Sequence, residues 1–475
     1  MRNIFITTII IICCSAGLNI TMHFESLDEI TLEKAENNTK EVRENSLFHY
    51  LESLESYSVQ SSEVINNPKF GPAGHVGGGV NIHFVKGHTQ DLDMIAAAGF
   101  KFVRMDFVWQ NIEEIKGNYN WAAYDELTAN LEQRGLRAIY ILDYSNSLYE
   151  GTVEFNHQDT GKSGKGISAP VHDESIAAFA RWSAASALHF HGNNIIWEIW
   201  NEPNVSHFWK PKPNVTQYTK LSIAAASAIK DQVPEATIIG PATSKVPLPF
   251  LESYLSSGIL KYIDAVSVHP YRDYSKSPET ATTDYEKLHE LISQYAPDNK
   301  KNIPIISSEW GYASATNGVS LEKQAEFIVR MQLINLLNSI PVSIWYDWKN
   351  DGKDPGNFEH NCGTVTFDLQ PKPSYKCIQI MNRQLENFTM SHRMDLGNDH
   401  DYVIFFQNNK GNFKIAAWTM DIPHTIKINI DVSGINGATA IDGYGNLIKL
   451  KTEQKKLFLN LDTLPLYIDL SGDVR

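Results

Sequence analysis

From about residue 74 onward, short apolar runs alternate with amphipathic segments. The runs have the length and composition of buried strands, and apolar residues in the segments between them recur at helical spacing. We expect eight strands, at 76–84, 102–107, 137–142, 195–200, 237–240, 265–268, 304–308 and 342–346. Strands that alternate with helices are typical of a parallel sheet. Eight such units predict an α/β fold, a (β/α)8 TIM barrel over 74–390.

The helical segments support this order. We expect helices at 91–99, 121–135, 176–187, 217–231 and 321–338, with Ser320 capping the last one. The segment 145–170 has scattered Gly and Ser and is expected to be a long loop. A doubly wound open sheet is the alternative, but no expected strand is followed by a Gly-rich phosphate-binding sequence.

The pattern changes near residue 391. Short strand-like runs follow at 402–406, 413–418, 425–432, 439–441 and 457–461, with turn residues and no helical spacing between them. This pattern predicts an antiparallel β-sandwich as a C-terminal side domain over 391–475.

The N-terminal part differs from both domains. Residues 1–18 have a basic start, an apolar core and small residues near a cleavage point, which predicts a signal peptide and a secreted or extracytoplasmic protein. Cys13 and Cys14 leave lipid attachment open, although the preceding isoleucines fit a lipobox poorly. Residues 19–73 are polar and acidic, and we expect a leader or linker that is partly helical.

Composition narrows the classes of partner. The 475-residue chain has 41 basic and 55 acidic side chains, a net charge of −14, which argues against a nucleic-acid or anionic-membrane surface. Cys362 and Cys377, the cysteines outside the signal, could form a disulfide or stay as thiols. The chain has no Cys/His spacing typical of zinc and no calcium-loop pattern, so we expect no metal.

Two glutamates follow buried strands. Glu202 lies in Asn-Glu-Pro after the fourth strand, and Glu309 ends the seventh. Barrel enzymes place their chemistry at the carboxyl ends of strands. A pair of carboxyl groups there suits double-displacement glycoside hydrolysis, in which one group gives and takes a proton and the other attacks the sugar carbon. The structural alternatives are an exposed loop or capping glutamate for Glu202 and a buried ion-pair partner for Glu309.

Other polar and aromatic residues share this end of the barrel. Arg104 is expected to keep a site carboxylate charged or to brace the barrel, with Glu198 as its structural partner. His269 could contact the substrate or nucleophile, or be a hydrogen-bonded core residue. Tyr271 could hydrogen-bond the nucleophile. We expect Trp345, rather than Trp348, to be the stacking platform for a sugar ring.

Four motifs together carry a resemblance. They are Val-Arg-x-Asp at 103–106, Trp-Asn-Glu-Pro at 200–203, Val-His-Pro-Tyr at 268–271 and Ser-Glu-Trp-Gly at 308–311. In this order they resemble glycoside hydrolase clan A, most closely family 39 and cellulase-like (family 5) enzymes. The resemblance implies retaining hydrolysis without a cofactor, with Glu202 as acid/base, Glu309 as nucleophile and Asn201 holding the sugar 2-hydroxyl.

The substrate is expected to be a β-linked oligo- or polysaccharide. Phe208 and Trp209, in the loop after Glu202, favour an open groove with extra sugar subsites. The alternatives are an exo-acting β-xylosidase or β-glucosidase with a closed pocket, a transglycosylase, and a non-catalytic carbohydrate-binding barrel. We expect a monomer with no nucleic-acid partner and no membrane association after signal removal.

Overall fold

The structure is a computed structural model, and it describes residues 59–60, 68–71, 74–75, 77–157, 161–430, 439–453 and 456–470. The expected signal peptide and most of the expected leader lie outside these residues. Among the described residues, no helix is long and apolar enough to cross a membrane.

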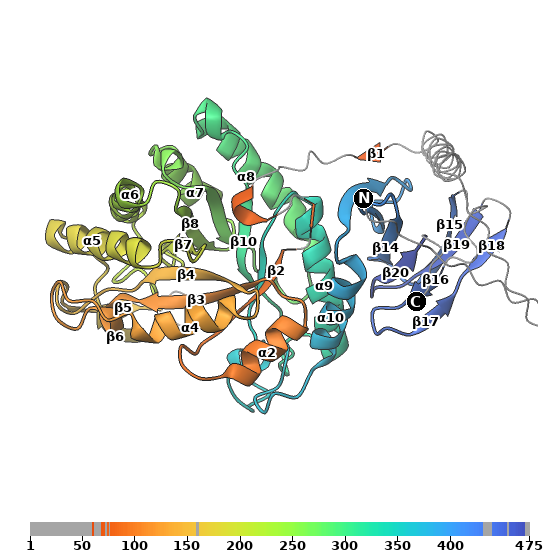
Figure 1. The fold of residues 1–475 in the computed structure, drawn as a ribbon, viewed down its shortest axis with the longest axis horizontal. Helices are drawn as coiled ribbons and strands as arrows, with labels where there is room; N and C mark the ends of the chain where they lie inside the picture. The colour runs from red at the N-terminus through yellow and green to blue at the C-terminus, as the bar shows by residue number, and fades with distance from the viewer. Residues whose placement is uncertain are drawn as a thin grey trace, which may run out of the picture. The chain divides into compact units, whose positions relative to one another are not determined.

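Eight parallel strands close into a barrel, in the spatial order β10-β11-β2-β3-β4-β7-β8-β9 (Figure 1). Their bounds are β2 (Gly78–Asn81), β3 (Phe102–Val108), β4 (Arg137–Asp143), β7 (Ile196–Ile199), β8 (Thr237–Ser244), β9 (Ala265–His269), β10 (Ile305–Trp310) and β11 (Ser343–Trp345). All eight expected strands are present, and the prediction of a TIM barrel is confirmed.

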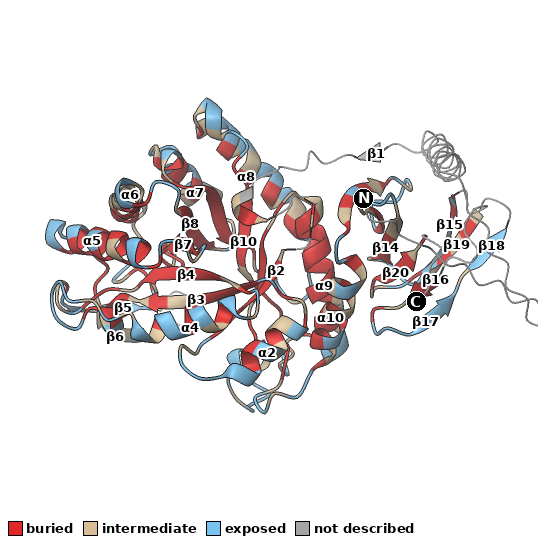
Figure 2. Cartoon of the chain, in the orientation of Figure 1, coloured by how far each residue is buried: buried red, intermediate tan, exposed pale blue. Residues whose placement is uncertain are grey.

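Helices follow or precede these strands around the barrel. They are α2 (Thr89–Ala97), α3 (Trp109–Ile112), α4 (Ala122–Glu132), α5 (Asp173–His189), α6 (Val215–Gln232), α7 (Leu248–Leu255), α8 (Thr282–Tyr295), α9 (Leu321–Leu337) and α10 (Pro373–Leu385), with short 3-10 turns η1 (Pro68–Phe70), η2 (Ile259–Lys261), η3 (Pro278–Ala281), η4 (Asp298–Lys300) and η5 (Glu359–Asn361). The Ser320 side chain accepts a hydrogen bond from the Lys323 backbone N–H at 3.1 Å, so it caps α9 as expected. Figure 2 shows barrel strands such as β4 and β10 mainly buried, and helices such as α4 and α5 with both buried and exposed residues.

The barrel interior is filled at its amino-terminal end by one side chain from most strands. This inner cluster comprises Phe70, Phe102, Ile139, Ile196, Ile239, Ala265, Ile306, Val342 and Ile344. Side chains alternate across a strand, so residues two or four positions further along also point inward. Arg104, Glu198, His269 and Tyr346 occupy such positions on or just after β3, β7, β9 and β11.

The segment 145–170 contains a β-hairpin, where a long loop was expected. β5 (Thr152–Asn156) pairs antiparallel with β6 (Ser163–Ile167). Its sequence signal is weak because β6 carries two glycines, which are poor strand formers. At Gly164 an added Cβ would lie 2.9 Å from the ring of Phe155 across the hairpin, so a larger residue would require that ring to shift.

Antiparallel sheets follow the barrel. One has seven strands in the order β1-β12-β13-β14-β20-β16-β17, and the other has three in the order β15-β19-β18. The strands are β1 (Val59–Gln60), β12 (Thr389–Met394), β13 (Asp401–Gln407), β14 (Phe413–Thr419), β15 (His424–Asn429), β16 (Thr439–Ile441), β17 (Leu447–Lys449), β18 (Lys451–Glu453), β19 (Lys456–Leu461) and β20 (Leu466–Asp469). β1 pairs with β12, so part of the expected leader belongs to this sheet and is not only a linker.

A buried polar contact links the barrel to the seven-stranded sheet. Arg330 of α9 donates to both carboxylate oxygens of Glu279 in η3, each at 2.7 Å. The indole N–H of Trp418 on β14 donates to Glu279 Oε1 at 2.9 Å. One carboxylate therefore joins three elements. Cys362 and Cys377 are both buried free thiols, so the disulfide alternative is not realised.

Candidate active site

The two glutamates lie where regular strand structure ends. β7 stops at Ile199, and both Trp200 and Glu202 have positive φ angles, of 69° and 43°. This conformation is unusual for residues other than glycine. The Glu202 backbone N–H donates to the Ala242 carbonyl of β8 at 2.9 Å, which holds the turn in place. Glu309 sits near the end of β10, within a register shift between Ser307 and Trp310.

These turns bring the two carboxyl groups together. Glu202, Glu309 and His269 each place one ligand-type atom within 4.8 Å of the other two. The side chains of Glu202 and Glu309 are 11% and 12% exposed. Both glutamates are therefore shielded but still reachable from solvent, as a substrate requires.

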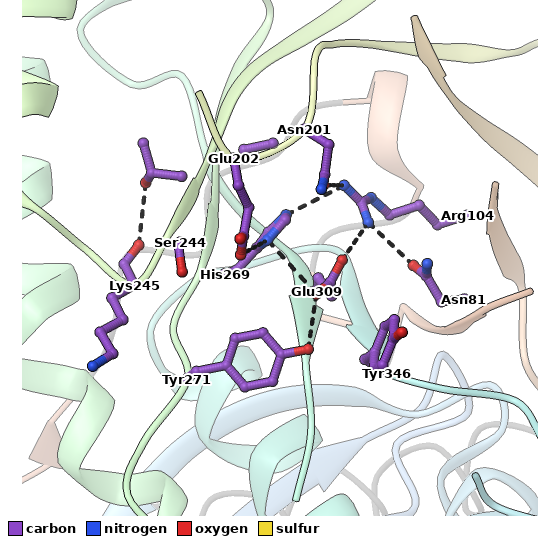
Figure 3. Close-up of polar contacts among 12 residues, drawn as sticks. Asn81, Arg104, Asn201, Glu202, Ser244, Lys245, His269, Tyr271, Glu309 and Tyr346 are labelled. Carbon is purple, nitrogen blue, oxygen red and sulfur yellow. Dashed lines mark hydrogen bonds and ion pairs between the residues drawn. The ribbon is translucent and has the colours of Figure 1, made fainter. Parts of the chain in front are cut away.

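Arg104 is fully buried and is linked by polar contacts to several residues of the site (Figure 3). Its Nε donates to Glu198 Oε2 at 2.6 Å, and its Nη1 donates to Glu309 Oε2 at 2.7 Å. Nη1 also reaches Asn81 Oδ1 at 3.3 Å, and Nη2 donates to Asn201 Oδ1 at 2.9 Å. The two carboxylates raise the pKa of Arg104 against the opposing effect of burial, so the guanidinium stays charged.

The contacts of His269 fix its tautomer. Arg104 Nη2 lies 3.2 Å from His269 Nε2 and can only donate, so Nε2 must be the unprotonated nitrogen. Nδ1 therefore carries the proton and donates to Glu202 Oε1 at 2.9 Å. Burial lowers the pKa of His269 to about 4, and the charge of Arg104 acts in the same direction. His269 is thus a neutral donor to Glu202.

Tyr271 completes the surroundings of Glu309. Its hydroxyl donates to Glu309 Oε1 at 2.8 Å, while Arg104 occupies the other oxygen. Burial, and next the charge of Glu309, raises the pKa of Tyr271 well above its ordinary value, so the hydroxyl keeps its proton. Both oxygens of Glu309 accept hydrogen bonds, as an ionised carboxylate does. This arrangement suits a nucleophile.

The barrel segment also matches a known family. Residues 73–352, more than half of the chain, match the family described as Cellulase (glycosyl hydrolase family 5). The chain belongs to this family. The resemblance to clan A predicted from the four motifs is therefore confirmed.

Curated relatives of this glycosyl hydrolase match over shorter stretches. A beta-xylosidase from Caldicellulosiruptor saccharolyticus is 26% identical over 202 residues, which are 39% of this chain and 40% of that protein. A beta-xylosidase from Geobacillus stearothermophilus is 34% identical over 92 residues, 19% of this chain and 18% of that protein. The aligned parts thus span well under half the length of either relative.

Solved structures share the fold over most of the chain. A family 39 glycoside hydrolase from Bacteroides cellulosilyticus WH2 superposes with a TM-score of 0.71 at 24% identity, covering 86% of this chain and 82% of that one. A GH39 beta-xylosidase from Caulobacter crescentus gives a TM-score of 0.59 at 15% identity, covering 87% and 98%. At these identities the likeness establishes the fold alone.

The expectation that Trp345 is an aromatic platform facing the site is wrong. Trp345 is fully buried in the main core, and its indole N–H donates to the Cys362 carbonyl at 3.0 Å. Ile344 belongs to the inner cluster, so its neighbour Trp345 must point outward toward the helices. Tyr346 has the inward parity instead and lies beside Glu309 in Figure 3. Strand parity could have identified Tyr346 from the sequence.

Trp209 is also wrong as a sugar subsite. It is fully buried, and its ring packs edge-on against Trp200 with centroids 5.2 Å apart. Phe208 is partly exposed and stacks on Tyr144 with centroids 5.8 Å apart. The sequence argument for an open groove therefore loses the support of Trp209 and keeps only that of Phe208.

A second acidic pair was not predicted. Asp143, at the end of β4, is fully buried. Burial, and next the negative charge of Asp106 on β3, raises the pKa of Asp143 well above its ordinary value, which favours its neutral form. The two residues are far apart in sequence, and only the pairing of β3 with β4 brings them together.

Proposed function

We propose that the protein is a retaining β-glycosidase in which Glu309 is the nucleophile and Glu202 the acid/base. The single observation that carries this proposal is the distance between the glutamates, whose carboxylate oxygens approach within 4.8 Å. Retaining enzymes separate these groups by about 5–5.5 Å, whereas inverting enzymes need about 6.5–9.5 Å to admit a water molecule. Nearest oxygens within 4.8 Å of each other are compatible with the retaining separation of the carboxyl groups, and on this basis we propose double displacement.

In the first step, Glu309 attacks the anomeric carbon while Glu202 gives a proton to the leaving glycosidic oxygen. The bond to the leaving group breaks, and a glycosyl ester forms at Glu309. Arg104 and Tyr271 hold Glu309 as an oriented acceptor before the attack, because each donates to one of its oxygens.

In the second step, Glu202 takes a proton from water, which attacks the anomeric carbon and releases Glu309. The product keeps its original configuration because two inversions have occurred. His269 is a positioning residue: its Nδ1–H holds Glu202 Oε1 without itself taking up the proton.

The substrate that we propose is a β-xyloside or a related neutral β-glycoside. One observation supports it: the curated relatives are named beta-xylosidases. Loss of Trp209 as a subsite shifts the proposal toward exo action on short chains.

Hydrolysis of a panel of aryl β-glycosides tests the assignment. We expect the wild type to cleave the xyloside or a neutral relative, and Glu309→Ala to lose about 10⁴–10⁶-fold in kcat, as other enzymes do on losing a catalytic group. The control is Glu386→Ala, which changes an exposed glutamate after α10. Turnover that survives Glu309→Ala would refute the nucleophile assignment. A folded wild type that binds sugars but cleaves none would favour the carbohydrate-binding alternative.

We also propose that the protein is exported, on the basis of residues 1–18. Expression of the full chain in a secreting host, followed by intact-mass measurement of the extracellular protein, tests this. Cleavage near residue 18 is expected, and a full-length protein retained inside the cell would contradict it.

A further inference from the structure

Beside the candidate active site, His83, Asp347 and Asp351 form a rim cluster. One ligand-type atom from each lies within 4.8 Å of the other two, and His83 Nε2 is 3.4 Å from Asp347 Oδ2. The residues come from the loops after β2 and β11, which are parallel neighbours in the barrel. Topology, and not a sequence motif, therefore brings them together.

Asp347 shows that the rim cluster is more than a group of surface acids. Its side chain is 1% exposed, and neither carboxylate oxygen has a hydrogen-bond partner among the described residues. Burying a carboxylate without such partners is costly. Oδ1 has neither a hydrogen bond nor an ion pair among the described residues, and Oδ2 has only the His83 ring, whose Nε2 is 3.4 Å away.

The backbone around Asp347 is held firmly. Its carbonyl accepts a hydrogen bond from the Thr364 backbone N–H at 3.2 Å. The Trp348 backbone N–H donates to the Asn81 carbonyl at 3.0 Å, which ties the loop after β11 to the end of β2. The two loops that carry the rim cluster are thus fixed to each other before any ligand binds.

We propose that the rim cluster binds a divalent cation of the Zn²⁺ type, through His83 Nε2 and one oxygen each of Asp347 and Asp351. An imidazole with two carboxylates suits Zn²⁺, whereas Ca²⁺ and Mg²⁺ prefer oxygen ligands alone. Three protein ligands leave a fourth position for water or a substrate hydroxyl. This site would revise the expectation of a chain without metal.

The catalytic cluster of Glu202, His269 and Glu309 does not compete for the cation. Arg104 Nη1 lies 2.7 Å from Glu309, and Nη2 lies 3.2 Å from His269 Nε2. A divalent ion there would face a buried positive charge at close range. The rim cluster has no such guanidinium contact among the described residues.

A metal in the rim cluster would act on the active site through Tyr346. The His83 ring meets the Tyr346 ring edge-on, with centroids 5.5 Å apart and an interplanar angle of 76°. The Tyr346 hydroxyl donates to Glu359 Oε2 at 2.6 Å. A cation that fixes His83 would therefore limit the movement of the aromatic ring beside Glu309.

Calorimetric titration of the metal-free, untagged protein with Zn²⁺ tests the site. We expect one equivalent to bind, and His83→Ala and Asp351→Asn to weaken binding at least tenfold, because loss of even an outer-shell partner costs about 10–100-fold. Asp351 is exposed, so Asp351→Asn tests the site without disturbing the core. The matched control is His400→Ala, whose histidine pairs with the single carboxylate of Asp421 at 2.8 Å.

Several outcomes would overturn the proposal. Absence of saturable Zn²⁺ binding by the wild type would do so, as would binding that is unchanged in both rim variants. Binding that is lost in Glu202→Gln but kept in Asp351→Asn would place the metal in the catalytic cluster. Tighter binding of Ca²⁺ than of Zn²⁺ would contradict the ligand chemistry. None of these results depends on glycosidase activity.

Discussion

Arg104 organises the candidate active site because a guanidinium can donate in several directions within one plane. It contacts the structural carboxylate of Glu198 and the proposed nucleophile Glu309 at the same time. A lysine has a single charged nitrogen on a flexible stem and could not hold both carboxylates in this geometry. The position of Glu309 therefore depends on the complete guanidinium, and its charge alone would not be enough.

Tyr271→Phe removes one donor from Glu309 and leaves Arg104 in place. A hydrogen bond to a charged group contributes about 1.5–3 kcal/mol, so kcat/KM for an aryl β-glycoside should fall about 10- to 100-fold. Steady-state kinetics would measure this loss. The matched control is Tyr295→Phe, whose hydroxyl donates to Glu252 at 2.9 Å on the exposed surface, and it should keep full activity. Equal activity of both variants and wild type would contradict the role of Tyr271.

His269 should make stability fall in mild acid. Its pKa is lowered to about 4 in the folded state by burial, from 6.5 ordinarily, so the unfolded chain binds a proton at a pH where the folded chain does not. The stabilising contribution of the neutral His269 is thus fully present above the pKa of the unfolded chain. It declines as the pH falls toward the pKa of the folded chain. Between pH 7.5 and pH 5 this group should cost about 2 kcal/mol of unfolding free energy.

Urea unfolding of wild type and His269→Gln at both pH values isolates this effect. The variant should be less stable overall but should lose less stability between the two conditions. His400→Gln is the opposing control, because its hydrogen bond to Asp421 raises the pKa of His400. Replacing His400 should therefore not reduce the loss of unfolding free energy between pH 7.5 and pH 5. An identical pH dependence for wild type and His269→Gln would contradict the buried neutral histidine.

At the level of the element, β11 separates two neighbouring aromatics by strand parity. Trp345→Ala would leave a cavity in the core and should lower the free energy of unfolding by about 3–5 kcal/mol. Tyr346→Ala removes a partly exposed ring beside Glu309 and should raise KM by about 2- to 10-fold, the value of one aromatic contact. Chemical unfolding and steady-state kinetics on both variants would separate the stability role of Trp345 from the substrate contact of Tyr346. A larger KM effect from Trp345→Ala would return the platform role to that residue.

Elements with strong periodicity could be predicted from the sequence. Most of the barrel strands are apolar runs, although β2 and β8 contain glycine and polar residues, and the helix after Ser320 has an apolar face and a capping residue, so these signals are local. The two glutamates could also be predicted from the sequence, because the strand before each one ends abruptly. The pairings of Arg104 with Glu198 and of Tyr271 with Glu309 follow from the shared carboxyl end of the barrel.

The remaining features depend on tertiary pairing. The two-residue strand β1 exists only because β12 lies beside it. The two glycines of β6 weaken the strand pattern, so the sequence does not indicate the hairpin. Trp209 looked like a surface aromatic because it stands in a loop, but the loop folds it against Trp200. The rim cluster joins His83 to Asp347 across the closure of the barrel, which no local pattern encodes.

At the scale of the whole molecule, Glu279 connects the barrel to the seven-stranded sheet. It is buried and bonded to Arg330 and to Trp418, and the charge of Arg330 keeps its pKa low despite the opposing effect of burial. Glu279→Ala would leave the buried guanidinium of Arg330 without its carboxylate partner and should lower the free energy of unfolding by about 3–5 kcal/mol. Differential scanning calorimetry should show a lower Tm, with Michaelis constants close to those of the wild type below the transition.

The control for this contact is Glu174→Ala, which breaks an exposed pair with Lys116 and should change Tm little. Similar Tm values for Glu279→Ala and Glu174→Ala would show that the buried contact is not what joins the two parts of the described chain.

The central claim is that Glu309 forms a covalent glycosyl ester during turnover. Incubation with an activated 2-deoxy-2-fluoro-β-xyloside, followed by intact-mass measurement and peptide mapping, tests it most directly, because the fluorine slows hydrolysis of the ester. We predict one sugar per chain, attached to Glu309, with Glu202 and Glu198 unmodified. A label on either of those residues, or turnover of the matching aryl glycoside with inverted configuration and no adduct, would contradict the account.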